Sequence, residues 1–294
     1  MSINQQPIGI FDSGLGGLTV FKEIRRLLKY ENLIYFGDTA RVPYGNKSKE
    51  TIVKYSKEIT KFLLKHNVKL IVAACNTVSS LALDELKKEF NVPIFGVIEP
   101  GARRAYKKSI KSIEKIDNYK NIEYNLGVEV NTIAVIGTKA TIGSKAYSTA
   151  INRLNNHGKG ANITIIEKAC PLLVPLVEEG WIDSDITREI IKYYLQPIIE
   201  SNPSSIVLGC THYPMLKTII SKIINKNTEI IDSGKEVSIE VSNFLIDNNM
   251  LNTTSDKPFE NYYVSDDPEK FKLFGNNYLG KNITEDIKVV IDFL

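Results

Sequence analysis

Short apolar runs rich in isoleucine and valine alternate with longer amphipathic stretches along nearly the whole of this 294-residue chain. The alternation is typical of β-α units arranged around a mostly parallel sheet. The apolar runs predict strands at residues 7–11, 32–36, 69–73, 93–97, 132–136, 164–167, 205–208 and 229–231. Helical periodicity between them predicts helices at residues 49–66, 78–90, 145–154, 185–200 and 215–225. We therefore expect an α/β fold built on parallel sheets.

The chain contains an internal repeat, which indicates two related domains. Residues 70–77 (LIVAACNT) and 205–212 (SIVLGCTH) are both apolar strands that end in a cysteine, followed by polar residues and a helix. A weaker pair joins residues 10–14 with 135–139, and both pairs run in the same order. Two domains also agree with the length, at roughly 150 residues per domain. The polar segment 107–131 breaks the β-α rhythm and is expected to be a surface excursion or a domain join.

Two cysteines, Cys75 and Cys210, occupy equivalent positions of this repeat. Because ligands bind outside the carboxyl ends of parallel strands, we expect both thiols to face an active site in the cleft between two pseudo-symmetric domains. The helix expected after each cysteine offers N–H groups and partial positive charge, which favour the thiolate. A lone cysteine beside an apolar strand is more often an inert buried residue, as expected for Cys170, which has no repeat partner.

The loops after the first two predicted strands carry further candidate groups. Asp12 and Ser13 open the segment DSGLGG, which is no dinucleotide loop because the third glycine of G-x-G-x-x-G would fall at Thr19. Asp12 either points into the cleft or caps the following helix. Tyr44 and the Gly45 amide lie in a turn-rich loop that either binds a carboxylate or is purely structural.

Charge and composition exclude several other classes of protein. Lys and Arg total 37 and Asp and Glu 34, an excess too small to indicate a nucleic-acid or membrane-surface partner. Three cysteines are too few for a disulfide framework, which favours a reducing cytoplasm. The sequence shows no signal peptide, membrane-spanning run, metal-ligand motif or Walker loop, and no lysine context typical of pyridoxal phosphate. We expect a cytoplasmic protein with no metal and no cofactor.

Five segments together resemble the glutamate racemase family, and they follow the family's order across about residues 7–235. They are FDSGLGG (11–17), GDTARVPYG (37–45), AACNT (73–77), CPL through EEG (170–180) and LGCTHYP (208–214). Residues 262–279 resemble the tail of many members. The resemblance implies cofactor-independent interconversion of L- and D-glutamate that supplies D-glutamate for peptidoglycan, in an enzyme that often forms homodimers.

The resemblance also implies roles for individual residues. Two thiols would move protons at the α-carbon from opposite faces, with Cys75 acting on D-glutamate and Cys210 on L-glutamate. Asp12 would assist Cys75 or bind the ammonium group, and Glu178, or its neighbour Glu179, would act near His212. The implied substrate-binding residues are Asp12, Ser13, Tyr44, Gly45, Asn76, Thr77, Thr211 and His212. The family's domain plan places residues 1–98 and about 228–294 in one domain and about 99–227 in the other.

Three alternatives stay open. A racemase of the same two-cysteine type could act on aspartate or a related acidic amino acid. A non-catalytic two-domain protein could close on an amino acid, which would leave the matched cysteines unexplained. A thiol-disulfide oxidoreductase fits less well, because the cysteines lack C-x-x-C spacing.

Overall fold

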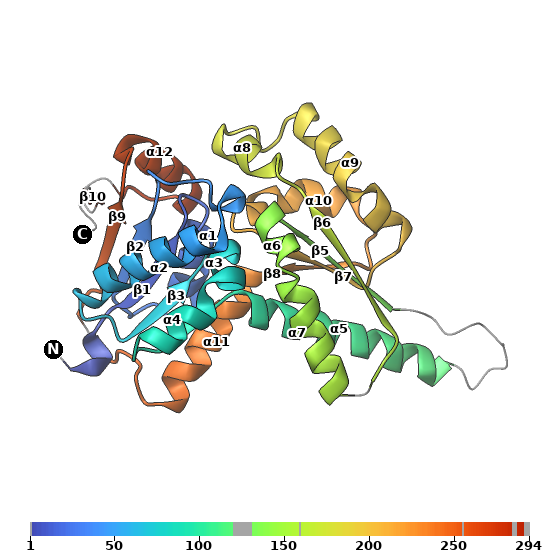
Figure 1. Ribbon diagram of the computed structural model, residues 1–294, viewed down its shortest axis with the longest axis horizontal. Helices are drawn as coiled ribbons and strands as arrows, with labels where there is room; N and C mark the ends of the chain where they lie inside the picture. Colours follow the sequence, from blue (N-terminus) through green and yellow to red (C-terminus); the bar gives the residue numbers. More distant parts are fainter. Residues whose placement is uncertain (1, 120–130, 159, 255, 284–286, 291–294) are drawn as a thin grey trace. The chain divides into compact units, whose positions relative to one another are not determined.

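The protein divides into two compact units of parallel α/β structure. The computed structural model describes residues 2–119, 131–158, 160–254, 256–283 and 287–290. The first unit comprises Met1–Val97 and Gly234–Leu294, and the second comprises Ile98–Ser233. In each unit, helices cover a central sheet (Figure 1).

In the first unit, the described strands form one parallel sheet in the order β10-β9-β2-β1-β3-β4. The strands are β1 Ile8–Asp12, β2 Leu33–Gly37, β3 Leu70–Ala73, β4 Ile94–Gly96, β9 Glu260–Val264 and β10 Ile287–Val289. The helices are α1 Leu18–Leu27, α2 Lys49–Leu64, α3 Asn76–Leu81, α4 Leu83–Glu89, α11 Ser233–Asp247 and α12 Pro268–Leu279, with 3-10 turns η1 Ile3–Gln5 and η2 Tyr44–Asn46.

In the second unit, the described strands form a parallel sheet in the order β6-β5-β7-β8. The strands are β5 Asn131–Gly137, β6 Ile163–Ala169, β7 Ser205–Gly209 and β8 Glu229–Asp232. The helices are α5 Ile98–Tyr119, α6 Lys139–Gly143, α7 Ala146–His157, α8 Leu173–Glu178, α9 Asp185–Glu200 and α10 Lys217–Ile223, with the 3-10 turn η3 Tyr213–Leu216.

The two sheets share one topology. The order β2-β1-β3-β4 of the first unit repeats as β6-β5-β7-β8 in the second, so β3 corresponds to β7. Cys75 follows β3 and Cys210 follows β7. The structure therefore confirms two parallel-sheet α/β units, and the sequence repeat corresponds to a repeated arrangement of strands.

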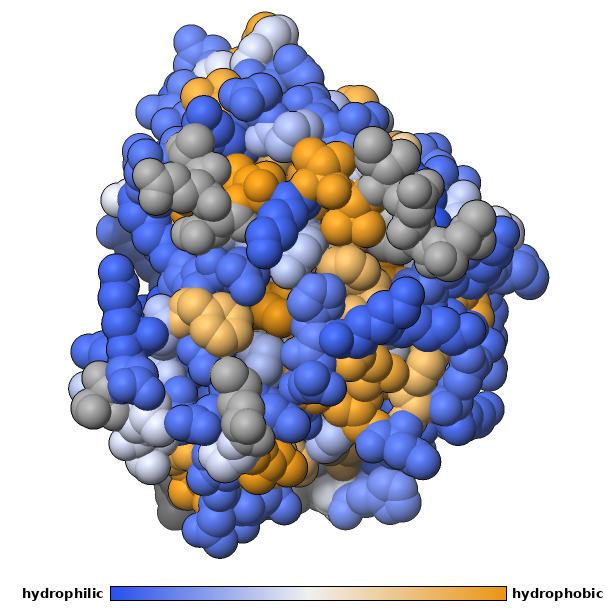
Figure 2. Space-filling view, turned by 90° about the vertical axis from the view of Figure 1, so that its left-hand side faces the viewer, coloured by the Kyte–Doolittle hydropathy of each residue, from blue (hydrophilic) through white to orange (hydrophobic). Residues whose placement is uncertain are grey.

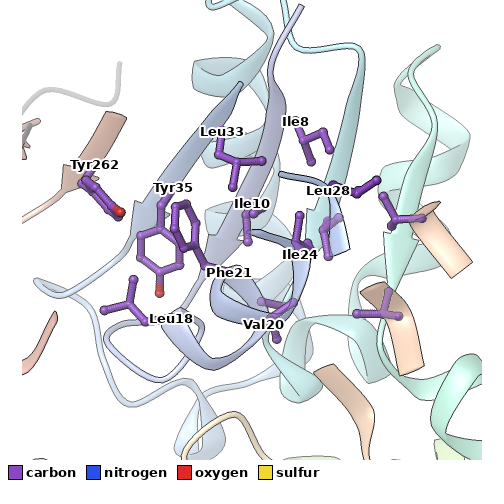
Figure 3. Close-up of a cluster of buried hydrophobic side chains, with 14 of the residues drawn as sticks. Ile8, Ile10, Leu18, Val20, Phe21, Ile24, Leu28, Leu33, Tyr35 and Tyr262 are labelled. Atoms are coloured by element: carbon purple, nitrogen blue, oxygen red, sulfur yellow. The ribbon is translucent and has the colours of Figure 1, made fainter. Parts of the chain in front are cut away.

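Both faces of the first sheet are buried, as parallel sheets require. Alternate residues of β1 divide between two apolar clusters, with Ile8 and Ile10 in one and Phe11 in the other. Figure 3 shows the first cluster, where Phe21 and Tyr35 lie beside strand residues such as Leu33. The continuous apolar runs of the sequence thus mark strands covered on both sides rather than amphipathic surface strands.

Several sequence expectations need correction. The helix expected at 78–90 begins earlier and divides at Ala82 into α3 and α4. The segment 107–131 was expected to break the β-α rhythm, but α5 continues through it to Tyr119, and residues 120–130 lie outside the described residues. The buried side of α5 carries Ala102, Ala105 and Ser109. These side chains are small rather than strongly apolar, so the helical periodicity is hard to recognise in a sequence rich in charged residues.

The carboxyl-terminal part of the chain adds strands that the sequence did not predict. β9 pairs with β2, and β10 pairs with β9. β8, which was predicted at residues 229–231, pairs with β7 of the second sheet. In this division the chain returns to the first unit only after Ser233.

One face of the molecule is mostly hydrophilic. Figure 2 shows one face on which hydrophilic residues predominate and hydrophobic ones gather in small groups between them. Apolar side chains normally make up a large share of a folded surface, so such groups need no special explanation. Among the described residues, every helix is too short or too polar to cross a lipid bilayer.

A buried ion pair joins the amino ends of the strands in the first unit. Lys69, just before β3, has a fully buried side chain whose Nζ lies 2.5 Å from Glu31 Oε2. The same ammonium donates to the carbonyl oxygens of Asn4 and Met250, both at 2.8 Å. Glu31 Oε1 accepts from the backbone N–H of Asn252 at 2.8 Å. This pair therefore connects the segments that contain Asn4, Glu31, Lys69 and residues 250–252. They lie at the amino ends of the strands, whereas Cys75 follows the carboxyl end of β3.

Replacing Lys69 with methionine should lower the free energy of unfolding by about 3–5 kcal/mol, because it leaves the Glu31 carboxylate buried without its counter-charge. Urea denaturation measures this value. The control Lys61→Met, at a 62% exposed side chain, should change it by less than about 0.5 kcal/mol. Equal effects of the two substitutions would contradict the structural role of the buried pair.

Candidate active site

The first half of the candidate site is built where β1 and β3 end. Cys75 is the N-cap residue of α3, so its side chain lies at the positive end of that helix. Its thiol donates to Ser13 Oγ at a distance of 3.6 Å, and Asp12, directly before Ser13, is fully buried. Asn76 and Thr77 form the first residues of α3 and are also buried. The structure thus brings together the first-unit residues that the sequence singled out around Cys75.

The Asp12 loop is held in place by close backbone packing. Asp12 Oδ2 accepts from the Gly14 N–H at 3.0 Å, and the Tyr35 hydroxyl donates to the Gly14 carbonyl at 2.7 Å. A Cβ atom on Gly17 would lie 2.4 Å from Asp12 Cβ, which no side chain can tolerate. The N-cap residue of α1 is Gly17 rather than Asp12. Because glycine has no side chain, Gly17 allows the backbone of this loop to lie against Asp12.

Tyr35 stays protonated beneath this loop. Burial, reinforced by the nearby Asp12 and Cys75, raises its pKa well above the ordinary value. The phenol therefore remains a hydrogen-bond donor to the loop.

The loop after β2 holds Tyr44 through a buried carboxylate. The Tyr44 hydroxyl donates to Asp38 Oδ2, which also accepts from Arg41 Nε at 2.7 Å. Burial, together with the Asp38 charge, raises the pKa of Tyr44 far above its usual range. The phenolic proton is thus directed at Asp38. Sequence reasoning did not select Asp38 as a site residue. The only feature of the sequence that indicates it is its position, as a charged residue directly after β2.

The second half of the candidate site has a different partner for its thiol. Cys210 follows β7, and its Sγ lies 3.8 Å from His212 Nδ1. On the other side of the ring, His212 Nε2 lies 3.1 Å from Glu178 Oε1 at the end of α8. The geometry selects Glu178 over Glu179, which the sequence had left open. Cys210, His212 and Thr211 are all buried.

Hydrogen bonding gives His212 a strong preference for the protonated state. Desolvation by burial lowers its pKa, but the hydrogen bonds to Cys210 and Glu178 outweigh that effect and raise the pKa to about 10. An imidazolium next to Cys210 can donate to a thiolate and stabilise its charge. Glu178, His212 and Cys210 thus form one chain of side-chain contacts.

The two thiols differ in the backbone that follows them. The sequence predicted a helix directly after each cysteine. This prediction is correct for Cys75, which is followed by α3. After Cys210 the chain instead enters the 3-10 turn η3, whose N-cap residue is His212. Gly137 of β5 pairs with Gly209 of β7, so Thr138 and Cys210 each follow directly after this pair. Sequence reasoning did not select Thr138, although residues 135–139 form the weaker repeat with residues 10–14, which contain Asp12.

Comparisons with known proteins agree with this geometry. Residues 8–237 match the family model described as Asp/Glu/Hydantoin racemase. A glutamate racemase from Geobacter metallireducens is 42% identical, with 98% of this chain and 97% of that protein covered. One from Neisseria meningitidis is 40% identical, with 97% of each covered.

This chain belongs to the Asp/Glu/hydantoin racemase family. The crystal structure of a Francisella tularensis glutamate racemase in complex with D-glutamate matches it with a TM-score of 0.83 at 36% identity, covering 98% of both chains. A glutamate racemase isoform from Bacillus anthracis matches with a TM-score of 0.85 at 32% identity, also covering 98% of both chains. The resemblance noted from the five sequence segments is therefore confirmed over nearly the full length.

The third cysteine of this racemase is a buried structural residue, as expected. Cys170 is fully buried, and its thiol donates to the Lys168 carbonyl at 3.6 Å. Burial raises its pKa to about 12, so it stays a neutral thiol at physiological pH. Within the described residues, no group of three or more His, Cys, Asp or Glu side chains could hold a metal ion.

Because His212 holds its proton until the pH approaches about 10, its ring should titrate far above the ordinary midpoint near 6.5. The substitution Glu178→Gln removes the carboxylate that favours the imidazolium, so the midpoint should shift toward neutral pH. NMR titration of the His212 ring measures it, with assignment by a His212→Asn variant. Glu179→Gln, at an exposed neighbour, should leave the curve unchanged, and equal shifts in both variants would contradict the role of Glu178.

Proposed function

We propose that this protein is a glutamate racemase that interconverts L- and D-glutamate with two thiols and no cofactor. The observation that carries the proposal is the equivalence of Cys75 and Cys210, buried free thiols that follow corresponding strands of a repeated sheet. Near-full-length similarity to glutamate racemases supports the substrate. In this proposal the two units are the two domains of the enzyme, and each carries one of the two thiols.

Each direction of the reaction uses the two sulfurs in opposite protonation states. With L-glutamate, the Cys210 thiolate removes the α-proton while the Cys75 thiol delivers a proton to the opposite face of the α-carbon. The product is D-glutamate, and the enzyme is left with a Cys210 thiol and a Cys75 thiolate. That state is the one required to act on D-glutamate, so the reverse reaction restores the starting form.

Different neighbours support the two proton transfers. The His212 imidazolium, held by Glu178, stabilises the Cys210 thiolate before it takes the proton. Ser13 accepts from the Cys75 thiol, and Asp12 assists this sulfur or binds the substrate ammonium. These groups act at atoms that gain or lose charge in the reaction, which is where electrostatic support is most effective.

The α-proton of an amino acid is only weakly acidic, so the developing carbanion needs stabilisation. Hydrogen bonds to the substrate carboxylates and exclusion of water supply it. The groups we assign to substrate binding are Asp12, Ser13, Tyr44, Gly45, Asn76, Thr77, Thr211 and His212. The Tyr44–Gly45 turn acts through its backbone, since the Tyr44 hydroxyl donates to Asp38.

The setting of the reaction follows from the same proposal. D-glutamate made by the enzyme would enter peptidoglycan synthesis and so affect cell shape, in the cytoplasm. We propose a homodimer that has no nucleic-acid or membrane partner, consistent with the small net charge of +3.

The test is deuterium incorporation at the α-carbon of L-glutamate in deuterated water, without added pyridoxal phosphate. The wild-type protein should incorporate deuterium and produce D-glutamate. Cys75→Ala and Cys210→Ala should each lower racemisation in both directions by about 10²- to 10⁴-fold, because each removes one of two obligatory proton carriers. Cys170→Ala is the matched control and should retain activity. Full activity of either active-site variant would refute the two-thiol scheme.

The same assay separates the alternatives. A racemase specific for aspartate would convert aspartate faster than glutamate when the two are measured side by side. A non-catalytic binding protein would bind glutamate without any exchange of its α-proton. Charge-assisted hydrogen bonds of roughly 1.5–3 kcal/mol each to the side-chain carboxylate would favour glutamate over shorter analogues.

A further inference from the structure

The first sheet has an extension that the second lacks among the described strands. β2 and β6 occupy corresponding positions, but β9 lies beside β2, whereas β6 is the last described strand on its side of the sheet. The register of this extension pairs Gly37 with Val264, the last residues of β2 and β9. Asp38 and Ser265 each follow directly after that pair. The extension therefore ends at the start of the loop that carries Tyr44.

Ser265 makes contacts with this loop through both its backbone and its side chain. Its N–H donates to the Gly37 carbonyl at 3.1 Å. Its hydroxyl donates to Asp38 Oδ1 at 2.8 Å and accepts from the Ala40 N–H at 2.8 Å. The side chain is buried, so water cannot readily replace these bonds. One hydroxyl thus fixes both a carboxylate and the backbone two residues beyond it.

Asp38 passes this constraint on to the candidate substrate loop. Ser265 donates to its Oδ1, while Tyr44 and Arg41 donate to its Oδ2. Donors on both oxygens fix the plane of the carboxylate, and the Tyr44 ring is held at its end. Gly45, the adjacent residue, carries the N–H that we assign to a substrate carboxylate.

We propose that Ser265 is a positioning residue that fixes the Tyr44–Gly45 turn for binding of a substrate carboxylate, an inference that rests on the proposed function. It acts through Asp38 and does not touch the substrate. The residue comes from the carboxyl-terminal segment, which contributes none of the assigned substrate contacts, so its effect should appear in substrate binding rather than in proton transfer.

The substitution Ser265→Ala tests this inference in the full-length protein. We expect KM for both L- and D-glutamate to rise roughly tenfold, with kcat within about twofold of wild type, because a hydrogen bond to a charged group is lost in the binding loop. Ser265→Thr keeps the hydroxyl and should keep KM within about twofold. The matched control is Ser238→Ala, a buried serine of the same unit whose hydroxyl donates to the Lys235 carbonyl, and it should leave KM unchanged.

A double substitution tests the route through Asp38 and Tyr44. If Ser265 acts through them, the KM increases of Ser265→Ala and Tyr44→Phe should be far from multiplicative when combined. Multiplied effects, an unchanged KM in Ser265→Ala, or a KM in Ser265→Thr as high as in the alanine variant would overturn the inference. If wild-type protein racemises glutamate and Ser265→Ala behaves like Ser238→Ala, only this inference fails. If wild-type protein shows no racemisation, the proposed function fails.

Discussion

The parallel pairing of β1 with β3, and of β5 with β7, is the constraint on which the candidate site depends. Parallel strands end at the same edge of a sheet, so residues that are distant in sequence emerge side by side there. Ser13 and Cys75 meet in this way at 3.6 Å, although 62 residues separate them. The same arrangement in the second sheet places Thr138 and Cys210 directly after the paired Gly137 and Gly209. A buried sheet with little freedom to shift thus sets the position of each sulfur.

The two units repeat their strands but not the chemistry around their thiols. Cys75 has the N-terminus of α3 and the Ser13 hydroxyl as neighbours, whereas Cys210 has an imidazolium held by a carboxylate. A reversible proton transfer between two faces of one carbon requires one sulfur to be ionised while the other is protonated. Different neighbours for the two sulfurs suit this requirement, because each sulfur is stabilised in its own way. We infer that the repeat supplies the scaffold and that the loops supply the asymmetry.

Much of this organisation could be predicted from the sequence, because buried parallel strands leave continuous apolar runs. The strands from β1 to β8 were anticipated within a few residues, as were both thiols. β9 escaped notice because its sequence ENYYV mixes polar and aromatic residues, and its partner β2 lies more than 200 residues earlier. Asp38 and Ser265 were not predicted as partners either, because only the pairing of β9 with β2 brings them together. The choice of Glu178 over Glu179 required the orientation of α8, which neighbouring glutamates in a sequence cannot reveal.

The most direct measurement of the central claim is a crystal structure of the protein with D-glutamate bound. If two thiols act on one carbon, Cys75 Sγ and Cys210 Sγ should lie on opposite faces of the α-carbon, each at roughly 3.5 Å from it. A complex in which only one sulfur reaches the α-carbon, or in which both lie on the same face, would contradict the claim.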